Sequence, residues 1–186
     1  MRVISGYLKG KNILFLKSSI TRPLKDVVKE NIFNIIQHSN LIKISLIQSS
    51  VLDLYSGVGS FGIECISRGA KEVSFVEKNN ETIEVLNNNL INLNIEAKST
   101  LYQKDTFSFL KNLKKDDKYN MIFLDPPFAE KYFLEDLKLI KNYKIFKKDH
   151  LIIIHRDVKS VDDIKNELNV LFTREYGRSK IIFGTF

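Results

Sequence analysis

Four consecutive residues, Asp125-Pro126-Pro127-Phe128, carry the groups needed to hold a flat amine at the end of a buried strand, residues 119–124. The two prolines fix the turn and have no backbone N–H, so their carbonyls are left as hydrogen-bond acceptors. The Asp125 carboxylate and the Pro126 carbonyl would accept the two N–H bonds of an exocyclic amino group, and Phe128 would stack on the base. These four residues are our candidate catalytic residues.

The chemistry that such a turn favours is nucleophilic attack by the amine. The lone pair of an aryl amine is delocalised into its ring, which makes the nitrogen a poor nucleophile. Two acceptors would favour the pyramidal nitrogen that attacks and would stabilise the positive charge that develops on it. Asp125 would also take the released proton, directly or through a water molecule. The alternative is a rigid turn between a strand and a helix, with no ligand.

A glycine turn forms the second chemical feature. Gly57-x-Gly59-x-x-Gly62 stands between an apolar run, residues 51–54, and a short helix that begins near Phe61. Glycine takes backbone angles that other residues avoid and lets a ligand approach the chain closely. Strand, glycine turn and helix together predict the nucleotide-binding corner of a doubly wound sheet. The same spacing satisfies the dinucleotide fingerprint, so it does not by itself identify the cofactor.

Asp53 favours a cationic cofactor at this corner. It lies at the end of the strand, beside the helix N-terminus that a pyrophosphate would otherwise approach. A carboxylate there would repel a diphosphate but would suit S-adenosylmethionine, which carries a sulfonium and an ammonium group and no phosphate. The alternative is that Asp53 only caps the turn.

Two further acids follow neighbouring strands. Glu77 ends the strand over residues 73–76, where its carboxylate would accept both hydroxyls of a ribose, unless it is an ordinary surface group. Asp105 follows a third strand, residues 99–104, where it would accept the adenine exocyclic amine or N-cap the helix that runs through Leu113. These two roles of Asp105 are compatible.

The rest of the chain completes an α/β pattern of short apolar strands and amphipathic helices. Before the glycine turn, residues 2–7 and 12–16 predict a hairpin, and a helix follows residues 21–26. Beyond it we expect helices at residues 80–93, 134–140 and 161–168, a strand at 151–154, and a terminal hairpin of residues 170–176 and 180–183.

Positive charge is concentrated near the N-terminus. The 186-residue chain has a formal net charge of +7, and its first 50 residues hold eight basic and two acidic residues. We therefore expect residues 1–45 to form an RNA-facing arm and residues 46–186 to form the cofactor-binding domain. The candidate RNA-binding residues are Lys9, Lys11, Arg22 and Lys25. The alternative is a solvated lysine-rich surface, because Lys, Asn and Ile are plentiful throughout.

Several classes of protein are disfavoured. The chain shows no signal-peptide pattern and no apolar run long enough to span a bilayer. Its single cysteine, Cys65, excludes an intrachain disulfide and suggests a packing role, which fits a reduced cytoplasmic setting. His38, His150 and His155 lack metal-ligand spacing, so we interpret them as structural or surface residues and expect no metal.

These residues resemble a known family. Residues 53–59, Glu77 and residues 125–128 are similar to the motifs of class I S-adenosylmethionine-dependent amino-methyltransferases. Five features more narrowly resemble RsmD, the bacterial 16S rRNA (guanine-N2)-methyltransferase family, and the likeness runs from residue 1 to about residue 183. The five features are Arg2-Val-Ile-Ser-Gly6, Thr21-Arg-Pro23 with Asp26, Glu30-Asn-Ile-Phe-Asn34, Ser67-Arg-Gly-Ala70 and Tyr176-Gly177.

The resemblance implies an α/β class I methyltransferase fold, a Rossmann-like sheet of seven strands in the order 3-2-1-4-5-7-6 with the last strand antiparallel. Helices would cover both faces, and an N-terminal β-hairpin and helix would precede them. It also implies transfer of a methyl group to the N2 of a guanine in 16S rRNA during assembly of the small ribosomal subunit.

Carried over by position, the resemblance assigns the site residues. The cofactor set is Asp53, Ser56, Gly57 and Gly59 around the methionine part, Glu77 at the ribose with Lys78 beside it, and Asp105 near adenine. Arg22 would lie at the active-site mouth, against the methionine carboxylate or an RNA phosphate. Two departures stand out. Leu24 and Lys25 follow Arg-Pro where a threonine is usual, and His155-Arg156 stand after the fifth strand where an acid is usual.

We therefore expect direct in-line methyl transfer, with the protein aligning the reactants and placing charge. The expected partner is 16S rRNA or the assembling small subunit, and we expect a cytoplasmic monomer without membrane or metal. A DNA adenine-N6 methyltransferase is an alternative, but the chain has little room for a target-recognition region. An NAD-binding oxidoreductase would leave residues 125–128 without a role, and a non-catalytic rRNA-binding assembly factor would use only the basic arm.

Overall fold

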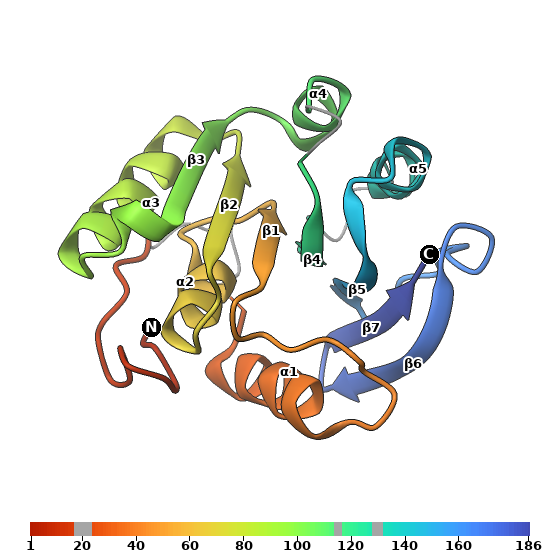
Figure 1. The fold of residues 1–186 in the computed structure, drawn as a ribbon, viewed down its shortest axis with the longest axis horizontal. Helices are drawn as coiled ribbons and strands as arrows, with labels where there is room; N and C mark the ends of the chain where they lie inside the picture. The colour runs from red at the N-terminus through yellow and green to blue at the C-terminus, as the bar shows by residue number, and fades with distance from the viewer. Residues whose placement is uncertain (17–23, 114–116, 128–131) are drawn as a thin grey trace.

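The structure is a computed structural model that describes residues 1–16, 24–113, 117–127 and 132–186 (Figure 1). Two residues predicted to act in the site, Arg22 and Phe128, lie outside the described residues. Seven strands form one sheet in the order β3-β2-β1-β4-β5-β7-β6, and β7 runs antiparallel to both neighbours. The predicted class I fold is confirmed, including its reversed last strand.

The strands are β1 (Ser50–Leu54), β2 (Glu72–Glu77), β3 (Ser99–Gln103), β4 (Tyr119–Leu124), β5 (Phe146–Asp157), β6 (Asn169–Tyr176) and β7 (Ser179–Thr185). The helices are α1 (Asp26–His38), α2 (Ser60–Ser67), α3 (Asn80–Asn92), α4 (Thr106–Lys111) and α5 (Phe133–Tyr143), with a 3-10 turn, η1, at Glu96–Lys98. The central strands β1 and β4 are buried along almost their whole length because helices cover both of their faces.

Alternate side chains of each strand point to opposite faces of the sheet and so enter two cores. Val51 of β1 packs with Phe61 of α2 in the core that α1, α2 and α3 cover. Leu52 packs with Leu137 of α5 in the core that α4 and α5 cover (Figure 1). Asp53 therefore faces α2, on the same side of the sheet as Val51.

The predicted N-terminal hairpin is a loop closed by one antiparallel bridge, between Arg2 and Asn12, rather than a pair of strands. The N–H groups of Val3 and Ile13 donate across the loop to the carbonyls of Lys11 and Met1, whereas those of Ile4 and Ser5 bond to the Glu64 carboxylate on α2. Three apolar residues of this segment, Val3, Leu8 and Ile13, are buried in the core under α1, α2 and α3. The segment is thus docked on the sheet domain.

The helix predicted at residues 161–168 was wrong. The chain forms turns there, and the bond from Leu168 N to Ile164 O, 2.9 Å, spans only one helical turn. Ile164 and Leu168 are buried at helical spacing, but Val161 is 99% exposed. The Asp162 carboxylate forms a buried ion pair with Arg156, and we attribute the irregular path of the segment to this contact.

No helix in the described part of the chain is both long and apolar enough to cross a membrane.

Candidate active site

The predicted site residues converge at one edge of the sheet. One row of paired residues crosses β2, β1, β4 and β5: Val76, Leu54, Leu124 and Ile154. The next residue in each of these parallel strands is Glu77, Tyr55, Asp125 and His155. The carboxyl ends of the strands therefore bring these residues together, where ligands bind in open α/β sheets.

Asp53 is a buried carboxylate that is half satisfied. Its side chain is on a residue only 1% exposed, and Oδ2 accepts a 2.9 Å hydrogen bond from the backbone N–H of Gly62 in the first turn of α2. Oδ1 is the single buried side-chain nitrogen or oxygen among the described residues that has no hydrogen-bond partner. A buried polar atom without a partner is costly, and this carboxylate lies against the last glycine of the turn through its bond to Gly62.

Electrostatics reinforce this point. Burial raises the pKa of Asp53 well above its usual value, and the charges of Asp125 and Glu77 raise it further against the hydrogen bond from Gly62. Ionisation of Asp53 would be favoured by a cation placed at Oδ1. The donor on α2 that a pyrophosphate would use is already taken by this carboxylate.

The glycine turn is shaped by sterics. Gly57 has φ +55° and Gly59 has φ +85°, a left-handed region that favours glycine. A Cβ on Gly59 would lie 2.3 Å from Cδ1 of Leu86 on α3, so α3 packs directly on the turn. Tyr55 has φ +59° and donates a 2.5 Å hydrogen bond to Asp136 of α5, which ties the strained residue to a neighbouring helix.

Glu77 is fixed to the same turn. Its Oε2 accepts from the N–H of Gly57 at 3.0 Å, and its Oε1 accepts from the N–H of Asn79 at 2.8 Å. Ser56, by contrast, uses its hydroxyl on the carbonyl of Val76 at 3.3 Å. Lys78 is exposed. Glu77 therefore joins the ends of β1 and β2, and each of its oxygens keeps a second lone pair for a ligand.

Asp105 caps a helix, one of the two roles predicted for it. It is the N-cap of α4, and its Oδ1 accepts a 2.9 Å hydrogen bond from the N–H of Ser108. That hydrogen bond lowers the pKa of Asp105. The residue is exposed just beyond β3.

Asp125 and the prolines form a held turn at the end of β4. The N–H of Asp125 donates to the carbonyl of Leu54 at 3.3 Å, and its carboxylate Oδ1 lies 2.8 Å from Nδ1 of His155. Pro126 is buried, and the carbonyl of Pro127 already accepts from Nη1 of Arg156 at 3.1 Å. Within the described part of the chain, the Pro126 carbonyl has no such partner, so it is the proline carbonyl that we consider for a substrate.

Arg156 and His155 make contacts around the Asp125 turn that the sequence did not predict. Arg156 is fully buried, makes a two-pronged ion pair with Asp162, and stacks its guanidinium 4.4 Å from the ring of Phe133. His155, interpreted from the sequence as structural or surface, is buried against Asp125. The one available signal was that His155-Arg156 replaces the usual acid after the fifth strand.

The described candidate RNA-binding residues Lys9, Lys11 and Lys25 are exposed. Lys29, counted among the basic residues of the arm, is instead fully buried and donates to the carbonyl of Arg2 at 3.0 Å. Burial lowers the pKa of Lys29, against the attraction of Glu64 and Asp26. Lys29 therefore contributes to packing and not to a surface for a polyanion.

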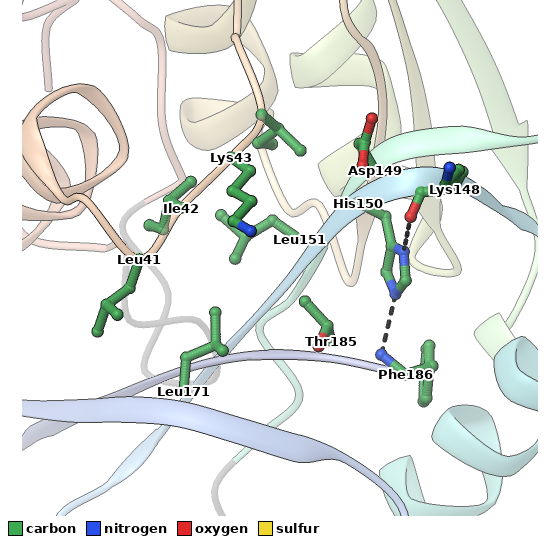
Figure 2. A pocket seen from close by; sticks show the side chains of 11 residues that line it. Leu41, Ile42, Lys43, Lys148, Asp149, His150, Leu151, Leu171, Thr185 and Phe186 are labelled. Atoms are coloured by element: carbon green, nitrogen blue, oxygen red, sulfur yellow. Dashed lines mark hydrogen bonds between the residues drawn. The ribbon is translucent and has the colours of Figure 1, made fainter.

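A cavity of about 270 Å³ lies at the opposite end of the sheet (Figure 2). It is lined by residues 41–44, 148–151, 171, 185 and 186, and by none of the described site residues. His150 there accepts from the N–H of Phe186 at 2.9 Å and lies 3.2 Å from the carbonyl of Lys148, so it ties β5 to the last residue. His150 is structural, as predicted. The described residues include no cluster of three or more potential metal ligands.

Known proteins are similar to this chain in sequence and in fold. The profile of the family described as "Conserved hypothetical protein 95" matches residues 1–185. The Bacillus subtilis protein YlbH, provisionally named an rRNA methyltransferase, is 34% identical over 158 residues, 84% of this chain and 83% of that protein. The Haemophilus influenzae ribosomal RNA small subunit methyltransferase D is 30% identical over 158 residues, 84% of this chain and 79% of that enzyme.

Among solved structures, the Escherichia coli protein yhhF has a TM-score of 0.83 at 22% identity, covering 99% of this chain and 96% of that one. At that identity the likeness is one of fold.

Proposed function

The chain belongs to the RsmD family, described as conserved hypothetical protein 95, and from this premise we propose that it methylates the N2 of a guanine in 16S rRNA with S-adenosylmethionine as donor. The family and the relatives indicate an rRNA methyltransferase. The choice of guanine N2, and the roles given to individual residues below, are the proposal.

The observation that carries the proposal is the unpartnered Oδ1 of Asp53. It is buried beside the glycine turn, where the ammonium of the methionine part would supply the missing donor and positive charge. Glu77 would hold the ribose hydroxyls, and Asp105 would accept from the adenine amine through the oxygen that does not cap α4. The bound cofactor would supply an electrophilic methyl group on a sulfonium.

Asp125 and Pro126 would hold the guanine amine. Their acceptors lie at the end of β4, next to β1, so an amine there faces the donor side of the glycine turn. As the new N–C bond forms, the nitrogen gains positive charge, and the two acceptors stabilise it. The released proton would pass to Asp125 or to a water held by it. Phe128 is proposed to stack on the base, as predicted from the sequence.

The exposed Lys9, Lys11 and Lys25 support an RNA-facing arm within residues 1–45 and a methyltransferase domain in residues 46–186. Surface lysines attract the phosphate backbone without reading its sequence, so they would position the substrate rather than select the guanine. Selection would then lie at the Asp125-Pro126 turn.

The test is transfer of radiolabelled methyl groups from S-adenosylmethionine to three substrates: deproteinised small-subunit rRNA, partly assembled small subunits, and DNA. We expect incorporation into one of the rRNA substrates, and mass spectrometry of nuclease digests should place it on guanine N2. Labelling of DNA adenine would favour the DNA methyltransferase alternative. Binding to rRNA without turnover on any substrate would favour a non-catalytic assembly factor.

A second test addresses the turn itself. Asp125→Ala should slow methyl transfer by about 10²- to 10³-fold, because it removes an acceptor and the proton acceptor together. The affinity for S-adenosylmethionine, measured by calorimetry, should stay close to that of the wild type. Asp149→Ala, at an exposed aspartate by the opposite cavity, is the matched control. Full activity of Asp125→Ala would refute the role of Asp125.

A further inference from the structure

Resting on the proposed function, we propose that His155 is a positioning residue that holds the Asp125 carboxylate in the orientation needed to receive the substrate amine. In the same arrangement Ser179 fixes the orientation and tautomer of the His155 ring. The three residues come from β4, β5 and the start of β7, which are neighbours in the sheet (Figure 1).

The contacts form a continuous chain. Nδ1 of His155 lies 2.8 Å from Oδ1 of Asp125, and Nε2 of His155 lies 2.9 Å from Oγ of Ser179. An ionised carboxylate only accepts hydrogen bonds, so Nδ1 carries a proton, and in the neutral ring Nε2 then accepts from the Ser179 hydroxyl. The ring is thus held at both nitrogens and is buried, with a side-chain exposure of 7%.

Asp125 needs such a partner because its side chain is 23% exposed and stands at the end of a strand. Without a contact its carboxylate could rotate about two side-chain bonds and face solvent. With Oδ1 bound to His155, Oδ2 remains available for the substrate, in a direction set by β5. An ordered acceptor aligned with the reacting nitrogen lowers the barrier through orientation.

The negative charges near Asp125 also favour a hydrogen-bond donor beside its carboxylate. Asp53 on β1 interacts unfavourably with both Asp125 and Glu77 of β2, so three carboxylates share this edge of the sheet. The Nδ1–H of His155 offsets part of the repulsion felt by Asp125.

The backbone of the turn is held by a different residue. Arg156, on the opposite face of β5, donates to the Pro127 carbonyl and is itself fixed by Asp162 and Phe133. Removal of the His155 side chain should therefore leave the turn in place and release only the carboxylate. This separation distinguishes a positioning role from a general structural one.

Three variants of the full-length protein test the inference: His155→Leu, His155→Asn and His155→Gln. Leucine fills the space without a donor, the asparagine amide can place its N–H near the position of Nδ1, and the glutamine amide reaches toward that of Nε2. Turnover at saturating rRNA and S-adenosylmethionine, cofactor affinity and the thermal unfolding midpoint are measured for each.

We expect His155→Leu to lower kcat by about 10- to 100-fold, the range for a lost hydrogen bond to a charged group. Its affinity for S-adenosylmethionine should stay within about twofold of the wild type, since the contact is on the substrate side. His155→Asn should recover most of kcat, and His155→Gln should not. Should His155→Leu fail to fold, the comparison of the two amide variants still decides the matter.

Two results would overturn the inference while leaving the proposed function intact. One is a kcat of His155→Leu equal to that of an active wild type. The other is that His155→Asn and His155→Gln are both folded and have equally reduced kcat values. Absence of wild-type methylation on every substrate would overturn both.

Discussion

Two buried carboxylates, Glu64 of α2 and Asp53 of β1 beside the first turn of α2, are equally hidden from water and yet oppositely satisfied. The residues are 0% and 1% exposed, respectively. Glu64 accepts hydrogen bonds from the backbone N–H groups of Ile4 and Ser5 at 2.7 and 2.9 Å, and from Arg68 Nε at 2.7 Å. Asp53 accepts one, from Gly62, and its Oδ1 has none.

Glu64 is part of a compensated cluster. Lys29 Nζ lies 3.9 Å from Glu64 Oε2 and donates to Ser60 on the same helix, so the negative charge faces two cations and two backbone donors. These bonds hold the N-terminal segment and α1 against α2. A buried charge with all of its partners within the protein serves the fold.

Asp53 lacks such compensation, and its environment destabilises the ionised form in the free protein. The chain thus keeps a buried carboxyl group where folding alone gains nothing from it. The comparison teaches that an unpartnered atom, rather than burial or charge itself, singles out Asp53 as the carboxylate that we propose binds the cofactor.

The largest effect should come from breaking the compensated cluster. Glu64→Gln leaves the buried Lys29 ammonium with only the partly exposed Asp26 as an anion and places an amide against two backbone donors. Removal of one partner from a buried ion pair costs about 3–5 kcal/mol in the free energy of unfolding, measured by urea denaturation. Glu84→Gln, at an exposed glutamate of α3, is the control and should change little. Equal stabilities of the two variants would break the comparison.

A smaller effect of opposite sign is expected at the other carboxylate. Asp53→Asn replaces a buried carboxyl group, whose ionised form is disfavoured, by a neutral amide and should raise the free energy of unfolding of the cofactor-free protein at neutral pH by about 1 kcal/mol. The same urea titration measures it. A less stable Asp53→Asn protein would show that the aspartate is satisfied in a way that the geometry does not reveal.

The pH dependence sharpens this prediction. Asp53 ionises near pH 4 in the unfolded chain, about its usual value, and its pKa is raised in the folded protein. The stability from the protonated form is fully present below the unfolded pKa and is lost as the pH rises through the folded pKa. The advantage of Asp53→Asn over the wild type should therefore be small near pH 4 and grow toward neutral pH. An advantage that shrinks with rising pH would contradict the assignment.

The smallest effect concerns a neutral contact in the same docked segment. The Ser67 hydroxyl accepts from the N–H of Leu8 at 3.0 Å and donates to the carbonyl of Ser5. Ser67→Ala should cost about 1 kcal/mol in unfolding free energy, the value for an uncharged hydrogen bond. A loss as large as that of Glu64→Gln would mean that docking of the segment, not charge, dominates the cluster.

The positions of the site carboxylates could be predicted from the sequence, but the hydrogen-bond partners of Glu64 could not. Strand ends and the glycine turn placed Asp53, Glu77 and Asp125 at one edge, because parallel strands bring their carboxyl ends together. Glu64 finds its partners Ile4 and Ser5 about sixty residues away, a separation that periodicity does not report.

The residues whose roles the sequence predicted wrongly are likewise ones whose partners are set by the fold. Lys29 counts as a positive charge in any composition, yet its ammonium is buried by the docked segment. His155 lies on the apolar pattern of β5 and contacts Asp125 only because β4 and β5 pair in register. The helix expected at residues 161–168 does not form, and Asp162 of that segment instead pairs with Arg156. In each case a polar contact of the folded chain, and not the local periodicity of the sequence, decided the outcome.

Calorimetry of cofactor binding tests the central claim, that Oδ1 of Asp53 is kept for the ammonium of S-adenosylmethionine. Wild type and Asp53→Asn are titrated with S-adenosylmethionine and with 5′-methylthioadenosine, which lacks the amino-acid part. The account predicts that the variant loses at least about tenfold in affinity for the first ligand, as expected for a charge-assisted hydrogen bond, and none for the second. Undiminished binding of S-adenosylmethionine by Asp53→Asn, or an equal loss for both ligands, would contradict it.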